Sequence, residues 1–291
     1  MKSAGEYAAL VEQALPQQLS GLGHMPERLK EAMAYSLEAG GKRLRPVLLL
    51  AVCDAMGTDL SSVMPYACAL EMIHTYSLIH DDLPAMDNDN LRRGKPTNHV
   101  VFGEGMAILA GDGLLHGAME LMLRTACKDD SLQGLHAAEA IARRAGVTGM
   151  VAGQVMDVTQ EGGQVTEEKV TYIHAHKTAD MLIAPLEAGL ILSGAEQEEI
   201  EAGITYGYHL GMAFQMVDDL LDVIGDEQVM GKQTGMDAQQ GKMTWVALKG
   251  IHGTKQDAAE HIRLACEAAD HFDQGVKFFQ ELAKNTLNRV Q

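Results

Sequence analysis

The sequence predicts an all-α protein, because three features of it favour helices packed into a bundle. Apolar residues recur at spacings of three and four along nearly the whole chain, and Leu70, Ile73, Ser77 and Asp81 mark one such helical stripe. Runs that alternate apolar and polar residues, which are typical of strands, are almost absent. Ala, Leu, Met, Glu and Gln, all favourable in helices, are plentiful, while aromatic residues make up 4% of the chain.

Short clusters of helix-breaking residues divide this pattern into segments that are long enough for helices of several turns. The breaks are expected at Gly40-Gly41, Met56-Gly57, Gly94 to Pro96, Asp129-Asp130, Gly162-Gly163, Ser193-Gly194 and Gly225 to Gly241. No Pro/Gly/Ser-rich linker and no shift in composition interrupts the chain, so we expect a single domain over residues 1–291. With 46% hydrophobic residues, the chain can bury a sizeable core.

Charge and cysteine content exclude several classes of protein. Forty acidic residues against 23 Lys and Arg give a net charge of −17, which opposes binding to nucleic acid or to an anionic membrane surface. A polyanionic substrate would therefore need cations that are clustered locally. The four cysteines show no C-x-x-C spacing and are expected to be buried, reduced thiols. The N-terminus lacks a basic segment followed by an apolar core, and no uninterrupted apolar stretch approaches ~18 residues, so we expect a cytoplasmic protein without membrane insertion.

An aspartate-rich motif occurs twice, at positions about 137 residues apart. The first spans residues 80–89 and contains Asp81, Asp82 and Asp87, and the second spans 214–222 and contains Asp218, Asp219 and Asp222. Two unit charges about 5 Å apart repel by roughly 3 kcal/mol at an effective dielectric of 20, so crowded, half-buried carboxylates need cations or protons. Hard oxygen ligands favour Mg²⁺, which shares its coordination with waters and substrate phosphates.

The two motifs differ in their expected local structure. Asp218 and Asp222 share one face of a helix. In the first motif Pro84 is expected to kink or end the helix soon after Asp82, so that Asp87 reaches back towards the metals. A solvated acidic helix face is the alternative for one isolated motif, but two such motifs on apolar helices are hard to explain in that way.

Cations lie close to these motifs. The segment GGKRLRP places Lys42 and Arg45 three apart, on one face if helical, after glycines where a helix start could donate N–H groups to an anion. Arg92 and Arg93 follow the first acidic motif directly. His74 lies seven residues before Asp81 on the same helix face, where it is either structural or in contact with phosphate.

Further candidate cations occur in the second half of the chain, where solvated surface charge is the alternative interpretation. They are Lys177, which precedes Thr178, together with Lys232 and Lys242. Gly153, Gln154 and Asp157 form a polar patch that is equally explained by a hydrogen-bonded contact between helices.

The ordered set of motifs resembles the trans-prenyltransferases, the family of farnesyl and geranylgeranyl diphosphate synthases. Between Gly40 and Thr244 the chain carries, in the family's order, GGKRLRP, DDxxxxD, LRRGKPT, GQxxD, KT, FQxxDDxxD and GKxxGxDxxxGKxT. The resemblance implies a helical bundle of the isoprenoid synthase type around a deep apolar cavity, usually homodimeric, with both aspartate motifs facing across its mouth. The family commonly continues after Thr244 with tyrosine and proline, whereas Trp245 and Val246 follow here, which puts the local helix geometry in doubt.

The resemblance also implies a role for each motif residue. Asp81, Asp87 and Asp218 would hold three Mg²⁺ on the allylic diphosphate, and Asp82 and Asp222 would contribute directly or through water. The allylic diphosphate would be bound by Arg92, Lys177, Lys232 and Lys242. Isopentenyl diphosphate would be bound by Lys42, Arg45, His74 and Arg93. Thr178 and Gln215 would line the region where the allylic cation forms, and Asp219 and Asp237 would support a metal or a lysine.

The implied reaction condenses isopentenyl diphosphate with dimethylallyl or geranyl diphosphate. The allylic C–O bond ionises when preorganised cations neutralise the leaving diphosphate, the isopentenyl double bond attacks the carbocation, and a proton is lost, plausibly to the departing diphosphate. Water must be excluded, because it would quench the carbocation.

Product length is expected to depend on Tyr76 and Ser77, which precede Asp81 by five and four residues. At a rise of about 1.5 Å per residue they lie roughly 6 to 7.5 Å deeper than the metal motif, with Tyr76 on the flank of the aspartate face. A tyrosine that only fills the core is the alternative. Bacterial farnesyl synthases carry an aromatic residue at this place, so the resemblance favours a fifteen-carbon product, farnesyl diphosphate.

Three other functions compete with this interpretation. A geranylgeranyl diphosphate synthase would differ only in product length. A terpene cyclase would need neither the isopentenyl site of Lys42, Arg45 and Arg93 nor a second aspartate motif. A regulatory subunit on the same fold is expected to have lost one motif, whereas this chain keeps both.

Overall fold

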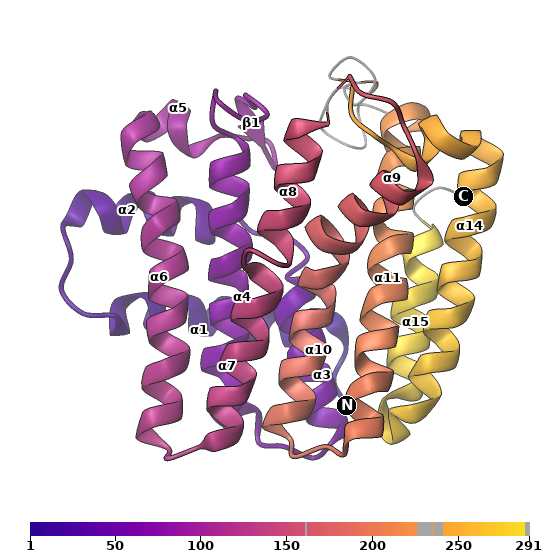
Figure 1. Ribbon diagram of the computed structural model, residues 1–291. Helices are drawn as coiled ribbons and strands as arrows, with labels where there is room; N and C mark the ends of the chain where they lie inside the picture. Colours follow the sequence, from indigo (N-terminus) through magenta and orange to yellow (C-terminus); the bar gives the residue numbers. More distant parts are fainter. Residues whose placement is uncertain (161, 226–234, 236–240, 289–291) are drawn as a thin grey trace. The chain divides into compact units, whose positions relative to one another are not determined.

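The computed structural model describes residues 1–160, 162–225, 235 and 241–288, and the predicted all-α class is confirmed (Figure 1). Outside helices and loops, the described chain contains one hairpin of two very short strands. The chain divides into two compact units. The first is Met1–Ile141 with Ile191–Gly194, and the second is Ala142–Leu190 with Ala195–Gln291.

The first unit is organised around one long helix that is enclosed by its neighbours. Its elements are α1 (Ala4–Gly21), α2 (Glu27–Leu37), α3 (Leu44–Ala55), α4 (Leu60–Asp81), β1 (Leu91–Arg92), β2 (Lys95–Pro96), α5 (Asn98–Phe102), α6 (Glu104–Lys128) and most of α7 (Leu132–Ala145). Asp59 caps α4, because its carboxylate accepts a hydrogen bond from Ser61 N at 3.1 Å. Helix α4 is apolar on all sides and packs against α1, α3 and α6, the last of which runs beside it (Figure 1).

Helix α6 is unusually apolar for its position. By length and composition it could cross a membrane, but 44% of its most apolar window is buried within the protein. An apolar core helix of a soluble protein passes the same test, so this feature is weak evidence for membrane insertion. Ile108, Leu109 and Leu123 of this helix remain exposed on the isolated chain.

The second unit is built around α11 and the helices that flank it. Its elements are α8 (Met150–Thr159), α9 (Glu167–Ile173), η1 (His174–Ala179), α10 (Asp180–Leu192), α11 (Gln197–Ile224), α14 (Trp245–Ala268), η2 (Ala269–His271), η3 (Asp273–Gly275) and α15 (Val276–Leu287). Helices α11, α14 and α15 lie side by side (Figure 1). One cluster of buried residues joins α9 to α11 and α14. It contains Val170, Ile173, Met212, Met216, Val217, Met243, Trp245 and Ala258.

The segment η1 is a π-helical turn that joins α9 to α10 without a loop. It contains Lys177 and Thr178, the KT pair of the sequence motifs. Helix α11 approaches this turn closely, because a Cβ added at Gly211 would lie 2.4 Å from the Cα of Ala179. Single π turns within helices are rare and often occur at functional sites, so η1 is a structural signal that supports the motif.

Most of the predicted helix breaks are confirmed. Helices end or begin at Gly40-Gly41, Met56-Gly57, Asp129-Asp130, Gly162-Gly163 and Ser193-Gly194. The break from Gly94 to Pro96 is also present, and there the chain forms a β-hairpin between α4 and α5. Most of the break from Gly225 to Gly241 lies outside the described residues.

Candidate active site

The first aspartate motif forms a tight loop at the end of α4. The helix ends at Asp81, and Asp82 occupies its C-cap, so the end expected from Pro84 is confirmed. The backbone N–H of Asp87 then donates to the carbonyl oxygen of Asp81 at 2.8 Å. Asn88, with φ of 55°, makes the return possible and donates to Leu83 O at 3.1 Å. The loop therefore returns Asp87 to the end of the helix, beside Asp81.

The hairpin that follows holds the two motif arginines. Strands β1 and β2 pair Arg92 with Lys95, and the two turn residues, Arg93 and Gly94, have φ of 53° and 74°. Two central residues with positive φ are typical of a type I′ turn. Tyr35 Oη fixes the hairpin to α2 by donating to Pro96 O at 2.8 Å.

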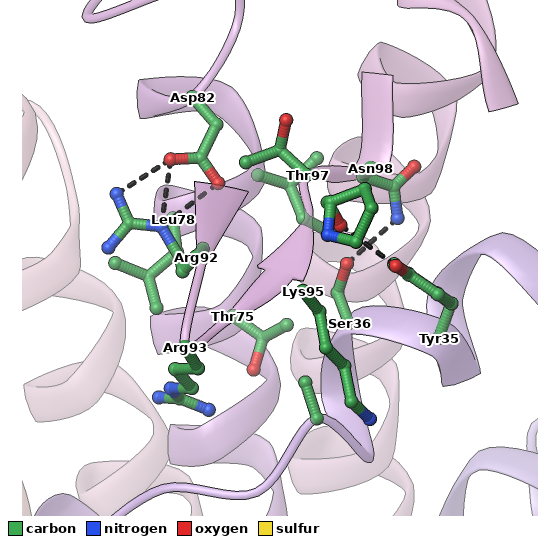
Figure 2. Close-up of a pocket in the computed structure, with 13 residues that line it drawn as sticks. Tyr35, Ser36, Thr75, Leu78, Asp82, Arg92, Arg93, Lys95, Thr97 and Asn98 are labelled. Atoms are coloured by element: carbon green, nitrogen blue, oxygen red, sulfur yellow. Dashed lines mark hydrogen bonds and ion pairs between the residues drawn. The ribbon is translucent and has the colours of Figure 1, made fainter. Parts of the chain in front are cut away.

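Arg92 and Arg93 are adjacent in sequence, but their side chains extend in different directions (Figure 2). Arg92 binds both carboxylate oxygens of Asp82. Its Nε lies 2.7 Å from Oδ1 and 2.9 Å from Oδ2, and its Nη2 lies 2.6 Å from Oδ1. Burial raises the pKa of Asp82, and the Arg92 guanidinium opposes that shift. Arg93 instead donates to the carbonyl oxygen of Gly40.

The GGKRLRP segment is shaped by its glycines. Gly40 and Gly41 have φ of 81° and 127°, a region that L side chains rarely adopt. The Arg93 guanidinium lies directly over Gly41, since a Cβ added there would be 2.6 Å from its Cζ. Helix α3 begins only at Leu44, so Lys42 precedes the helix, and the expectation that Lys42 and Arg45 share a helix face is wrong.

His74 lies within the electrostatic influence of several arginines, among them Arg45 and Arg93, which were predicted to bind isopentenyl diphosphate with it. Burial lowers its pKa well below the ordinary value, and the positive charges of Arg45, Arg93, Arg92 and Arg43 lower it further. The arginines that act on this α4 imidazole come from α3, its N-cap and the hairpin. Ser77 lies one turn further along α4 and donates its hydroxyl to His74 O at 2.9 Å.

A pocket of about 380 Å³ lies beside this cluster in the first unit (Figure 2). Thr75, Leu78 and Asp82 of α4 form one wall, and Arg92, Arg93 and Lys95 of the hairpin form another. Tyr76 lies on a different side of α4, where it is 7% exposed and packs its ring edge-on against His80 at 5.7 Å. Burial, and secondarily Asp81, raise the pKa of Tyr76 to about 12.

The second aspartate motif lies in the last turns of α11, where its members have different surroundings. Asp219 is 2% exposed, and both of its oxygens accept hydrogen bonds, from Gln215 Nε2 at 3.1 Å and from Trp245 N at 2.7 Å. Gln215 in turn accepts a hydrogen bond from Thr178 Oγ1 at 2.7 Å. Asp219 therefore supports Gln215 and Thr178. Asp222 is also buried, whereas Asp218 is partly exposed.

Lys177 is held by helix α8. Its Nζ lies 2.5 Å from Oδ2 of Asp157, and a Cβ added at Gly153 would lie 2.2 Å from the Lys177 backbone nitrogen. A contact between helices, one of the two explanations for the polar patch at Gly153 and Asp157, is therefore present, and it positions the π turn. A pocket of about 400 Å³ brings together several predicted residues of this unit, but Asp218 and Asp222 are not among the residues that line it. Its lining includes Lys177, Thr178, Gln215, Asp219 and Lys242.

Trp245 resolves the doubt over the local helix geometry. Thr244 caps α14 by accepting a hydrogen bond from Ala247 N at 3.1 Å, so a helix begins at Trp245, and it kinks at Gly250, whose φ is 69°. The indole Nε1 donates to Asp257 at 2.7 Å, and the ring lies 5.7 Å from that of His174. Lys232 and Asp237, the other residues expected near this motif, lie outside the described residues.

Several residues of the site had no signal in the sequence pattern. His174 lines the second pocket and its Nε2 lies 3.4 Å from Asp219 Oδ2. Arg43 and Glu71 form a buried pair beneath the first cluster. Glu71 is a single polar residue in an apolar stretch, whereas Arg43 lies inside the GGKRLRP motif, where nothing in the sequence separates its role from those of Lys42 and Arg45.

The carboxylates of the two motifs fit Mg²⁺ by their chemistry. Within the part of the chain that the structure describes, no three His, Cys, Asp or Glu side chains are gathered closely enough to hold a metal ion between them. Mg²⁺ is usually bound through one or two carboxylates, with waters and substrate phosphates completing its coordination. The hard oxygen donors of Asp81, Asp87 and Asp218 match that mode of binding.

Comparison with known proteins gives one consistent result. The family model described as Polyprenyl synthetase matches residues 26–280. The chain is 50% identical over 263 residues to a farnesyl diphosphate synthase of Geobacillus stearothermophilus, covering 89% of this chain and 88% of the relative. It is 45% identical over 253 residues to a geranylgeranyl pyrophosphate synthase large subunit of Arabidopsis thaliana, covering 85% and 68%.

Solved structures agree with the sequence relatives. An FPP/GFPP synthase from Zymomonas mobilis matches with a TM-score of 0.86 at 32% identity, over 98% of this chain and 97% of that one. A geranyltransferase from Legionella pneumophila matches with a TM-score of 0.86 at 34% identity, over 98% and 95%.

Proposed function

The chain belongs to the polyprenyl synthetase family, and we propose that it condenses isopentenyl diphosphate with dimethylallyl and geranyl diphosphate to give farnesyl diphosphate. It is a transferase of the prenyltransferase class. The observation that carries the proposal is the Arg93 guanidinium, which lies over Gly41 of the GGKRLRP segment and apart from the Arg92–Asp82 pair, because a cyclase that ionises one diphosphate has no use for a second anion site. A geranylgeranyl product is the second candidate, since plant synthases of that product are 45% to 47% identical.

Polyprenyl synthetases use Mg²⁺, and the aspartates of both motifs fit it. Asp81, Asp87 and Asp218 would hold three ions, with Asp82 and Asp222 contributing directly or through water. Bound Mg²⁺ supplies Lewis-acid neutralisation of the charge that grows on the leaving diphosphate. The Arg92–Asp82 pair keeps a cation and a carboxylate in fixed geometry at the end of α4.

The cations of the chain would divide between the two substrates. Arg92, Lys177 and Lys242 would bind the allylic diphosphate, with Lys232 from outside the described residues. Lys42, Arg45, His74 and Arg93 would bind isopentenyl diphosphate. Donors that are already held in place, such as Arg92 by Asp82 and Lys177 by Asp157, stabilise developing charge without reorganising.

Gln215 and Thr178 would face the allylic cation. Asp219 fixes Gln215, which accepts from Thr178, so the oxygens of this pair are oriented before substrate arrives. Attack by the isopentenyl double bond forms the new C–C bond, and the proton then lost from the adduct would go to the departing diphosphate.

We also propose a cytoplasmic homodimer that neither inserts into a membrane nor binds nucleic acid. The exposed Ile108, Leu109 and Leu123 of α6 give the dimer a physical basis, because a second copy would remove this apolar surface from water. The net charge of −17 opposes binding to nucleic acid.

The test uses purified full-length protein with isopentenyl diphosphate and each allylic primer in turn, and chromatography of the dephosphorylated products. We expect a fifteen-carbon product that requires Mg²⁺ and disappears in excess EDTA. Asp218→Ala is expected to lower the rate by about 10³-fold or more while circular dichroism stays unchanged. Full activity in EDTA would contradict the metal mechanism, and a twenty-carbon product would favour the second candidate.

A further inference from the structure

Arg43 is a buried cation of the GGKRLRP segment that takes no part in the binding described above. It is 3% exposed, although Lys42 and Arg45, the other basic residues of the segment, are assigned to substrate binding. It occupies the N-cap position of α3 with φ of 49° and ψ of 34°, in the left-handed region. A left-handed conformation is uncommon for residues other than glycine, so other contacts must maintain it.

Those contacts attach Arg43 to three surrounding helices. Its Nη1 donates to Glu71 Oε1 of α4 at 2.6 Å, and its Nη2 donates to Leu37 O, at the end of α2, at 2.9 Å. Its Nε lies 3.6 Å from Glu12 of α1. The guanidinium therefore fixes the segment between α2 and α3 to the centre of the first unit.

Glu71 is the buried partner, and its surroundings argue against a role in stability alone. It is 1% exposed, and its second oxygen, Oε2, has no hydrogen-bond partner among the described residues. A buried ion pair whose hydrogen bonds are incomplete is often no more stabilising than apolar residues of similar size. Retaining it at this place suggests that its geometry or its charge is used.

Arg43 and Glu71 lie close in sequence to residues that we assign to isopentenyl diphosphate. Arg43 lies between Lys42 and Arg45 in sequence, and Glu71 lies one helical turn before His74 on α4. On the other side of the segment, the Arg93 guanidinium covers Gly41. The Glu71 carboxylate also favours the charged form of Arg93, opposing the effects of burial and of Arg43 and Arg92 on its pKa.

We infer that the Arg43–Glu71 ion pair is a positioning device for the isopentenyl diphosphate site. By holding Arg43 in the left-handed conformation, it fixes the directions in which Lys42 and Arg45 leave the backbone. By placing one negative charge beneath the arginines, it keeps them close together before the substrate anion arrives. This inference rests on the proposed function, because it assigns isopentenyl diphosphate to the cluster.

The test compares Arg43→Met, Glu71→Met and the double variant with the wild type, by steady-state kinetics in both substrates and by Tm. Arg43→Met leaves a buried carboxylate unpaired, so its Tm should fall. Its KM for isopentenyl diphosphate should rise about tenfold, while its KM for the allylic substrate and its kcat change less than about threefold. Arg43→Lys keeps the positive charge but not the planar guanidinium. Its KM for isopentenyl diphosphate should lie between those of the wild type and Arg43→Met.

The double variant separates positioning from stability. Removing both charges should restore most of the Tm, because no unpaired charge remains, but it should leave the KM for isopentenyl diphosphate raised. The inference is overturned if the double variant regains both the wild-type Tm and the wild-type KM for isopentenyl diphosphate. It is also overturned if Arg43→Met raises the KM values for isopentenyl diphosphate and for the allylic substrate equally.

Tyr7→Phe is the control for loss of stability elsewhere in the unit. It removes the hydrogen bond of 2.5 Å to Asp54 at the far end of α3 and should lower Tm without changing the ratio of the two KM values. Calorimetric titration with isopentenyl diphosphate alone supplies a readout that does not depend on turnover. Absence of turnover in the wild type would contradict the proposed function, whereas equal calorimetric affinities of wild type and Arg43→Met would overturn the inference.

Discussion

The ammonium group of Lys177 lies 2.5 Å from Oδ2 of Asp157, which joins the π-helical turn η1 to helix α8. Asp157 is 8% exposed, so the pair is screened from water more than a surface ion pair. Removing the carboxylate leaves Lys177 charged but without the contact that orients it.

Asp157→Ala is therefore expected to raise the KM for the allylic diphosphate about tenfold while the KM for isopentenyl diphosphate stays nearly constant. Glu167→Ala is the control, because it breaks the exposed pair with Lys249 in the same unit, and exposed pairs contribute little. A fall in the allylic KM of Asp157→Ala would show instead that Asp157 competes with the substrate for Lys177.

Gly153→Ala tests the packing that sets the π turn. The added Cβ would lie 2.2 Å from the Lys177 nitrogen, and backbone on both sides leaves no flexible side chain to move. We expect a loss of stability of about 1–3 kcal/mol or more and a lower kcat/KM for the allylic substrate. Gly5→Ala in α1 meets no atom within 4 Å and should keep both Tm and activity. Unchanged kinetics in Gly153→Ala would mean that α8 does not position Lys177.

The two hairpin arginines should have different kinetic roles, because Arg92 binds Asp82 and Arg93 donates to Gly40 O. Arg93→Ala is expected to raise the KM chiefly for isopentenyl diphosphate. Arg92→Ala leaves the buried Asp82 unpaired, which raises the pKa of Asp82 further, and should chiefly impair the allylic substrate. Initial rates with each substrate varied in turn are the measurement. If both variants weaken one and the same substrate, the division of the cations between the two diphosphates is wrong.

Much of this arrangement could be predicted from the sequence, for physical reasons. Helical periodicity and glycine pairs locate most helix boundaries, because both act locally. The ordered motifs identify Lys177, Thr178, Gln215 and Asp219, which line one pocket.

The remaining features depend on contacts between distant segments, which periodicity does not encode. The hairpin at Arg92 and Arg93 is only two residues long on each side, too short for an alternating pattern. The break between α1 and α2 and the one at Gly103 were not anticipated. Arg43 was identified only as part of a basic cluster, and its inward direction follows from Glu71, which is 28 residues away.

Tyr76→Ala tests where elongation stops. The tyrosine is buried on α4 before the first aspartate motif, and truncation opens space beside His80. We expect a substantial twenty-carbon fraction, because the space admits another isoprene unit. Tyr66→Ala is the matched control, since Tyr66 is a buried tyrosine of the same helix, ten residues earlier. It should lose stability but keep the product length. A native length distribution from active Tyr76→Ala would show that Tyr76 does not limit product length.

The final prediction concerns pH and a histidine pair in the second unit. The Nδ1 atoms of His209 and His261 lie 2.8 Å apart, between α11 and α14. Burial lowers the pKa of both histidines, that of His261 to about 4. His209 lowers the pKa of His261 further, while Asp257 and Glu260 oppose that shift. Because the folded pKa lies below the unfolded value of 6.5, this contribution to stability is present above pH 6.5 and is lost as pH falls towards 4.

Tm measured between pH 7 and 4 should therefore fall less steeply in His261→Gln than in the wild type. His252→Gln, which replaces an exposed histidine of the same helix, should follow the wild-type curve. Parallel curves for all three proteins would show that the pair does not contribute to acid sensitivity.

The π turn at His174–Ala179 has a consequence for how this stretch of chain is compared with other sequences. A π turn contains one residue more than the α-helical turn it replaces, so the side chains of α10 are rotated by about 100° relative to an uninterrupted continuation of α9. A sequence that is shorter by one residue in this segment could keep both flanking helices and their buried faces. It would lose only the widened turn, and with it the displaced backbone that carries Lys177 and Thr178. Gapped alignments through residues 167–192 should therefore be judged by whether they preserve this extra residue.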